Sequence, residues 1–202
     1  MHALLKLSNA VDGLNRFIGK YVIWLILAST VISAINAIVR KAFNVSSNAY
    51  LEVQWYLFAA TFLLCAAFTL LNGEHVKIDV LYSRWNKRTQ TWIDVFGFAF
   101  FLLPFCSAII WFSVPFFLKG LYSGEVSSNS GGLIRWPVYA MMPLGFSLLW
   151  LQGVSELIKR LAFLMGLIDD PTESAVEKTA EEELAEAIAK LAEEKAARAH
   201  AA

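Results

Sequence analysis

The sequence Asn72–Arg88, NGEHVKIDVLYSRWNKR, is a short charged segment held between two long apolar runs. It contains four of the 17 basic residues of the chain and one of its three histidines, His75. The stretches before and after it are apolar enough to be helices embedded in lipid. We therefore predict a membrane protein in which this segment is the central loop, and its charges decide which way the chain faces.

The composition supports this prediction. Of 202 residues, 57% are hydrophobic and only 17% are charged, which is too apolar for an ordinary soluble domain. The formal net charge of zero hides an asymmetry, because residues 1–168 carry 13 basic and 7 acidic side chains, whereas residues 169–202 carry 4 and 10. The basic residues lie at the ends of apolar runs, an arrangement that suits the lipid bilayer and its anionic headgroups but not nucleic acid.

Four apolar segments approach the length of roughly 20 residues that crosses a bilayer as a helix. These predicted spans are residues 21–39, 53–71, 92–118 and 138–158, within a transmembrane domain of residues 21–168. The third span is longer than the hydrocarbon layer and contains Pro104, so we expect it to tilt or to kink there. The fourth contains Pro143, which favours an ordinary kink over the interrupted helix of a transporter substrate site.

Three further segments flank the spans. Residues 1–20 have an apolar face at helical spacing, with Asp12 and Asn15 elsewhere, and predict an amphipathic interfacial helix; a frayed start of the first span is the alternative. The central loop predicts a short interfacial helix, and residues 169–202 predict an acidic, partly helical tail. The predicted fold class is thus an all-α membrane protein with four transmembrane helices and these three additions.

The distribution of positive charge predicts the orientation. If the N-terminus is cytoplasmic, nine basic residues, including the whole central loop, lie inside and four lie outside. This agrees with the excess of Lys and Arg in cytoplasmic loops. Both termini and the central loop are therefore expected in the cytoplasm.

The interiors of the four predicted spans contain no Asp, Glu, Lys, Arg or His, and Asp94 and Glu156 lie near the span ends. Ion-coupled carriers and pumps place ionisable groups near the midplane, because a migrating charge needs a partner there. The sequence therefore predicts a helical quartet without a buried ionisable group and without a solute pathway of its own.

No residues for catalysis or for a cofactor are found. Glu74, His75 and Asp79 could be imagined as metal ligands, but their spacing matches no HExxH-type motif. All three histidines fall outside the spans, which argues against haem ligation, and no phosphate loop or GxSxG motif is present. We expect no enzyme, no metal and no cofactor.

One stripe of the first span is small and polar, formed by Ser29, Ser33, Asn36 and Arg40 at steps of four, three and four. Such stripes usually mark packing against another helix through close approach and interhelical hydrogen bonds. A polar conduit is the minority interpretation.

The chain resembles the small membrane subunit, DctQ type, of tripartite ATP-independent periplasmic (TRAP) transporters over about residues 15–168. The resemblance depends on the order of the four spans together with Glu52–Trp55 (EVQW), Asn72–Tyr82 (NGEHVKIDVLY), Arg88, Asp94, Pro143–Phe146 (PLGF) and Leu151–Gln152. The acidic tail beyond Asp170 departs from the pattern that we associate with this family, so its role stays open.

The resemblance implies two partners. A large DctM-type membrane subunit would hold the substrate and sodium sites and move substrate by an elevator-like motion, and a periplasmic DctP-type binding protein would deliver an organic acid. This chain would brace the large subunit in the cytoplasmic (inner) membrane of a bacterium or archaeon, and residues 40–52 and 119–137 would add periplasmic docking surface. The candidate residues for anchoring loops or contacting a partner are Arg40, Glu52, Glu74, His75, Asp79, Arg88, Asp94 and Gln152.

Two other functions stay open. The chain could oligomerise into a self-contained transporter or channel, with a pore built from polar stripes such as Ser29, Ser33 and Asn36. It could also be an anchor or assembly factor that holds a soluble partner through the acidic tail.

Overall fold

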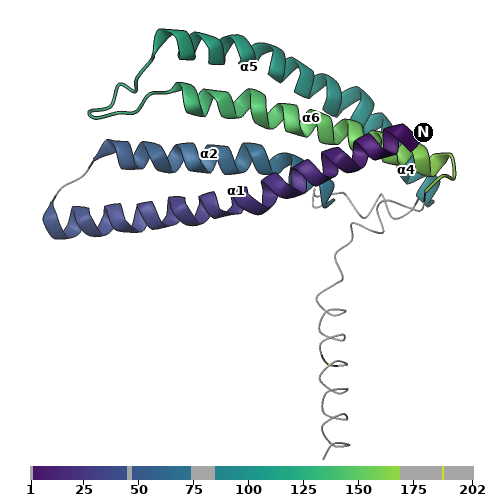
Figure 1. The fold of residues 1–202 in the computed structure, drawn as a ribbon, viewed down its shortest axis with the longest axis horizontal. Coiled ribbons are helices and arrows are strands. Elements are labelled where there is room, and N and C mark those ends of the chain that lie inside the picture. Colours follow the sequence, from purple (N-terminus) through teal and green to yellow (C-terminus); the bar gives the residue numbers. More distant parts are fainter. Residues whose placement is uncertain (1, 45–46, 74–84, 169–187, 189–202) are drawn as a thin grey trace, which may run out of the picture.

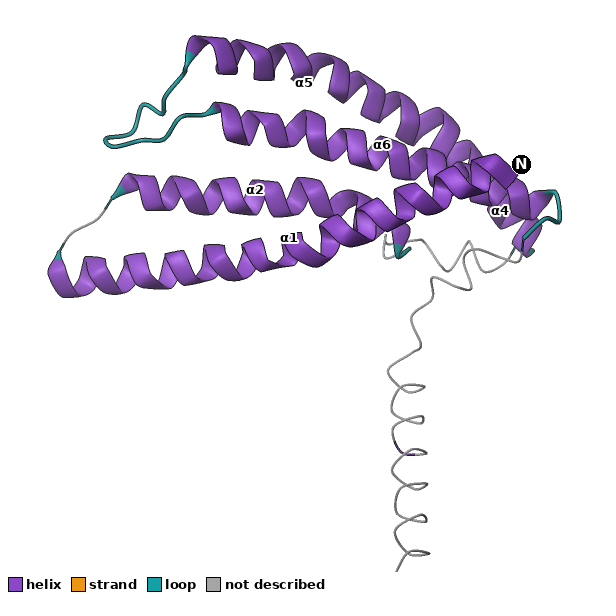
Figure 2. Ribbon diagram, viewed as in Figure 1, coloured by secondary structure: helices purple, strands orange, loops and turns teal. Residues whose placement is uncertain are grey.

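A computed structural model describes residues 2–44, 47–73, 85–168 and 188 of the chain (Figures 1 and 2). The elements are α1 (His2–Phe43), α2 (Asn48–Leu71), α4 (Lys87–Gly97), the π-helical turn η1 (Phe98–Leu102), α5 (Leu103–Ser123) and α6 (Trp136–Leu164). The described residues form no strand, and the prediction of an all-α protein is confirmed. The predicted central-loop helix and nearly all of the acidic tail lie outside the described residues.

In the described ranges four helical stretches are long and apolar enough to cross a membrane: Ala3–Phe43, Asn48–Leu71, Lys87–Ser123 and Trp136–Leu164. Each contains one of the four predicted spans. The prediction of a separate helix over residues 1–20 is replaced by one continuous helix, because α1 runs without a break from His2 to Phe43. Its N-terminal part is thus a rigid extension of the first span.

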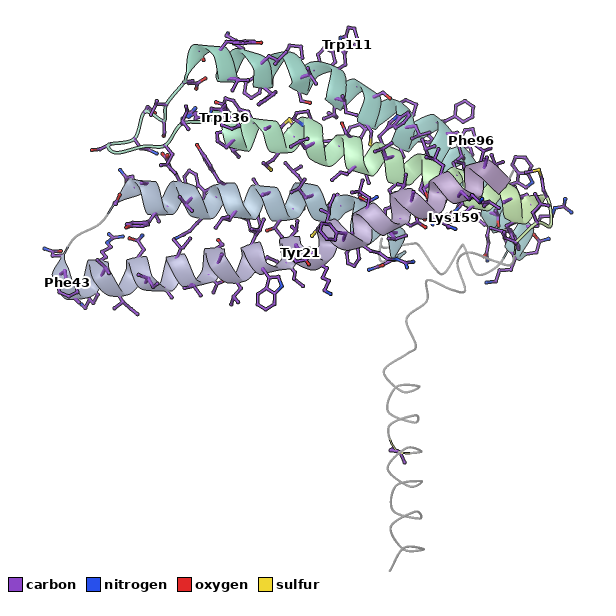
Figure 3. The ribbon with its side chains drawn as sticks, viewed as in Figure 1. Tyr21, Phe43, Phe96, Trp111, Trp136 and Lys159 are labelled. Carbon is purple, nitrogen blue, oxygen red and sulfur yellow. The ribbon has the colours of Figure 1, made fainter. Side chains whose placement is uncertain are left out.

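The four long helices lie side by side in one layer, in the order α1, α2, α6, α5 (Figure 1). α1 crosses obliquely, so that its N-terminal part lies against the end of α6. Few residues of the layer are buried within the described chain: 6% of an apolar 18-residue window of α1 and 28% of the corresponding window of α6. Trp111 on α5 points away from α6 and is 77% exposed (Figure 3). Such a layer needs lipid or another protein against both faces.

Glycine makes the contact between α2 and α6 close. A Cβ atom placed on Gly145 would lie 2.6 Å from the backbone oxygen of Leu63 and 2.8 Å from its carbonyl carbon. Small residues are enriched where membrane helices approach in this way. The middle of the layer is therefore held by backbone proximity.

The third span is distorted at η1, where the N–H of Leu103 donates to the carbonyl of Phe98, five residues earlier. Pro104 follows directly; proline has no N–H to donate, and its ring clashes with the carbonyl four residues before it. The wider turn accommodates both effects, as π-bulges do. The distortion that we expected at Pro104 thus begins one turn earlier. α6 continues through Pro143 without interruption, as an ordinary kink would allow.

Candidate functional site: polar clusters at the two ends of the helix layer

One group of polar side chains joins α1, α4 and α6 at the end of the layer where the N-terminus lies (Figure 1). We call this group the end cluster. Its members are Ser8, Asp12, Asn15, Asp94, Gln152, Ser155, Glu156, Lys159 and Arg160. Lys159, labelled in Figure 3, marks its position.

Gln152 is the central hydrogen-bonding residue of the end cluster and is 0% exposed. Its Oε1 accepts from Asn15 Nδ2 at 2.7 Å, and its Nε2 donates to Asp12 Oδ1 at 2.9 Å and to Glu156 Oε1 at 3.2 Å. One amide therefore satisfies groups on both helices. A buried side-chain amide that bonds in this way fixes the register of α1 against α6.

Two serines bring the same helices into close contact. The hydroxyls of Ser8 and Ser155 lie 2.6 Å apart, and that of Ser155 donates to Asp12 Oδ1 at 2.8 Å. Both serines are 1% exposed. The polar side of the N-terminal part of α1 thus faces protein, while Leu7 and Phe17 on its apolar side are exposed.

Charges alternate through the rest of the end cluster. Lys159 Nζ lies 3.0 Å from Asp12 Oδ2 and also pairs with Glu156. The guanidinium of Arg160 pairs with Glu156, donates from Nε to Asp94 Oδ2 at 2.9 Å, and lies 4.7 Å from the ring centroid of Phe98. Buried charges are tolerated when they are paired and hydrogen-bonded in this way. The network therefore ties α1 and α4 to the same two turns of α6.

The end cluster corrects one prediction. The quartet was predicted to lack a buried ionisable group, yet Asp12, Glu156 and Arg160 are 8%, 5% and 8% exposed. The prediction was wrong because it considered each span alone, and these groups are buried only where α1 crosses α6. A signal was available, since Ser8, Asp12 and Asn15 recur at steps of four and three and so share one helix face.

A second group lies at the opposite end, where α2 begins and α6 begins. Glu52, which is 3% exposed, accepts from Asn129 Nδ2 at 2.8 Å through Oε1 and from the Leu133 N–H at 2.7 Å through Oε2. We call this arrangement the loop clamp. It fixes the segment between α5 and α6, where Gly131 adopts a φ of +71° that favours glycine. Glu52 thus anchors a loop within its own chain.

Arg135, at the start of α6, extends the loop clamp. Its Nη1 lies 3.2 Å from Glu125 Oε1, and the hydroxyl of Tyr139 donates to the same oxygen at 3.2 Å. The hydrogen bond to Tyr139 and the nearby Glu125 carboxylate raise the pKa of Arg135 further above its ordinary value. Arg135 is therefore permanently charged. The hydroxyl of Tyr56 adds a bond to the Ile134 carbonyl at 3.1 Å.

The structure places the predicted site residues in three groups. Asp94 and Gln152 come together in the end cluster, and Glu52 lies in the loop clamp. Arg40 and Arg88 are exposed and pair with no carboxylate among the described residues. The other three candidates, Glu74, His75 and Asp79, lie outside the described residues.

The polar stripe of α1 packs on α2. Ser33 Oγ donates to Gln54 Oε1 at 3.2 Å, and Ser29 Oγ lies 3.4 Å from the Gln54 carbonyl. The stripe therefore serves as a helix-packing surface, as its majority interpretation predicted.

Helices of membrane-spanning length, a single apolar layer and polar contacts that connect the helix ends define a multi-pass membrane component. The family model of the DctQ component of tripartite ATP-independent periplasmic transporters matches residues 29–163, more than half of the chain. The chain belongs to this family, and it is thus a small subunit of a TRAP transporter. Family members work in complexes with a large membrane subunit and a solute-binding protein. No curated protein and no solved structure matches the chain.

Proposed function

We propose that this chain braces the large subunit of a sodium-coupled, binding-protein-dependent transporter for organic acids. The observation that carries the proposal is the single helix layer, in which the most apolar window of each span is at most 28% buried within the chain. A layer of this kind offers a large apolar surface to a second membrane protein. The end cluster joins helices at one end of the layer, and the loop clamp joins α2 to the loop before α6 at the other end. The chain can therefore act as a rigid support.

The polar groups are suited to bracing and not to carrying a solute. The charges of the end cluster are paired with one another and lie beside the last turns of α6. A carrier needs groups that exchange partners near the midplane as the solute passes. Substrate and sodium binding therefore belong to the large subunit in this proposal.

The sidedness follows from the charge distribution. The end cluster, both termini and the central loop face the cytoplasm, and the loop clamp faces the periplasm, within the inner membrane. The loop clamp then holds residues 119–137 in a fixed shape on the side where the binding protein arrives. Exposed Arg88, on the cytoplasmic side, is the candidate contact to the large subunit.

Uptake of a labelled organic acid in cells tests the proposal. Removing this chain while the large subunit is still made should abolish uptake, and the two membrane subunits should copurify in mild detergent. Normal uptake without this chain would contradict the bracing function.

Reconstitution separates the proposal from a self-contained transporter. Vesicles that contain only this chain should show no sodium-driven organic-acid flux, whereas vesicles with both membrane subunits and the binding protein should show it. Flux through the chain alone would overturn the proposal. Truncation after Asp170 should preserve uptake, whereas an anchor that acts through the tail would lose its soluble partner.

A further inference from the structure

A pocket with several polar side chains in its lining lies between α1 and α2, at the end where these two helices are joined. It has a volume of about 410 Å³, within the range of ligand sites in proteins. The side chains that line it include Ser33, Asn36, Arg40, Lys41, Leu51 and Gln54. Neither the end cluster nor the loop clamp contributes to it.

The positive charge of the pocket is not neutralised by the described part of the chain. Arg40 and Lys41 are exposed, and no described carboxylate forms an ion pair with either of them. None of the described residues that line the pocket is acidic. Two cations beside one cavity attract an anion.

Gln54 supplies an unused donor. The Ser33 hydroxyl donates to Gln54 Oε1, and the Nε2 group of Gln54 is buried without a hydrogen-bond partner in the described part of the chain. A buried polar group without a partner costs free energy, so an unsatisfied N–H in a binding pocket indicates a missing acceptor. The N-terminus of α2, which no side chain caps, adds further favourable field for an anion.

The position of the pocket indicates where the anion comes from. Arg40 and Lys41 directly follow the uncharged stretch 21–39, which places them at the level of the lipid headgroups. Ile38 and Phe43 beside them are 65% and 73% exposed, so acyl chains can pack next to the pocket. Labelled Phe43 marks this end of α1 in Figure 3.

We propose that this pocket binds the phosphate group of an anionic phospholipid, with Arg40 and Lys41 as the cations and Gln54 Nε2 as the buried donor. A soluble phosphate ester has the same charged group but lacks the acyl chains that pack beside the pocket. The proposal concerns a lipid site of this chain and does not depend on the bracing function.

Native mass spectrometry of the full chain in detergent tests this, with phosphatidylglycerol, diacylglycerol and glycerol 1-phosphate as separate probes. We expect one tightly bound phosphatidylglycerol, little diacylglycerol, and much weaker binding of glycerol 1-phosphate. Equal affinity for phosphatidylglycerol and diacylglycerol would overturn phosphate recognition. Equal affinity for phosphatidylglycerol and glycerol 1-phosphate would overturn the lipid as the source.

Three variants locate the site. Gln54→Glu keeps an acceptor for the Ser33 hydroxyl but replaces the donor by a negative oxygen, so phosphatidylglycerol binding should fall more than tenfold. The double variant Arg40→Gln/Lys41→Gln should weaken it by about fivefold for each charge removed. Lys119→Gln, an exposed change near the same end of α5, is the matched control and should bind normally.

The comparison between these variants decides the result. Unchanged or tighter phosphatidylglycerol binding in Gln54→Glu would overturn the proposal, because it would mean that the pocket does not present a donor to an anion. An equal loss in Lys119→Gln would overturn it as well, since binding would then follow overall charge. Equal unfolding midpoints of the variants would show that the fold is retained.

Discussion

Arg160→Gln is the substitution that tests the end cluster most directly. Arg160 is 8% exposed, and its guanidinium pairs with both Glu156 and Asp94, which belongs to α4. Removing one partner of a buried ion pair costs about 3–5 kcal/mol, and because Lys159 still pairs with Glu156 we take the lower end of that range, about 3 kcal/mol. We expect a loss of this size in the free energy of unfolding, measured by denaturant titration of the purified chain in mild detergent.

Second variants separate this effect from simple loss of packing. Adding Asp94→Asn to Arg160→Gln should cost less than the sum of the two single changes, because both members of one ion pair are then removed together. Arg135→Gln is the control, since its pair with Glu125 is exposed and such pairs contribute little. If Arg160→Gln and Arg135→Gln shifted the unfolding midpoint equally, the end cluster would not stabilise the fold as argued.

The remaining predictions concern other contacts. Gly145→Ala should destabilise the chain by about 1–3 kcal/mol, because the new methyl would meet the backbone of Leu63, whereas Gly97→Ala meets nothing within 4 Å and should stabilise by up to about 1 kcal/mol. The stability of both variants is measured from their unfolding midpoints. Equal changes in the two midpoints would contradict the close contact of Gly145 with the backbone of Leu63. Glu52→Gln should speed hydrogen exchange at the Leu133 amide, because the loop clamp loses a charged acceptor. An unchanged exchange rate would show that Glu52 is not needed to keep the loop between α5 and α6 in place.

The sequence predicted the spans well because crossing a bilayer demands long uncharged helices, and four stretches met that demand. Each observed helix extends beyond its predicted span, since polar residues continue a helix where they bond to protein or headgroups. The predicted boundary at residue 20, between an interfacial helix and the first span, is not a helix end in the structure. Nothing at Lys20 or Tyr21 stops a helix, and α1 passes through both.

Partners across the layer could not be predicted. The helical spacing of residues 1–20 showed which side of the segment is polar and which is apolar. It did not show which side packs on protein. In the structure the apolar side is exposed, and the polar side, with Asp12, bonds to α6. The contact of Glu52 with Leu133 joins residues 81 positions apart and leaves no local pattern. The order of helices in the layer is likewise a property of contacts between segments.

The π-helical turn η1 sets the rotational phase of the third span. Asp94 and Cys106 are 12 positions apart, so in an uninterrupted α-helix at ~100° per residue they would point ~120° away from each other. One residue absorbed at η1 reduces the difference to ~20°, which lets Asp94 meet Arg160 while Cys106 is buried further along the same span. Deleting Ala99 would therefore leave Asp94 and Cys106 11 positions apart in a regular α-helix, with the same difference of ~20° at ~100° per residue, so Asp94 should keep its contact with Arg160.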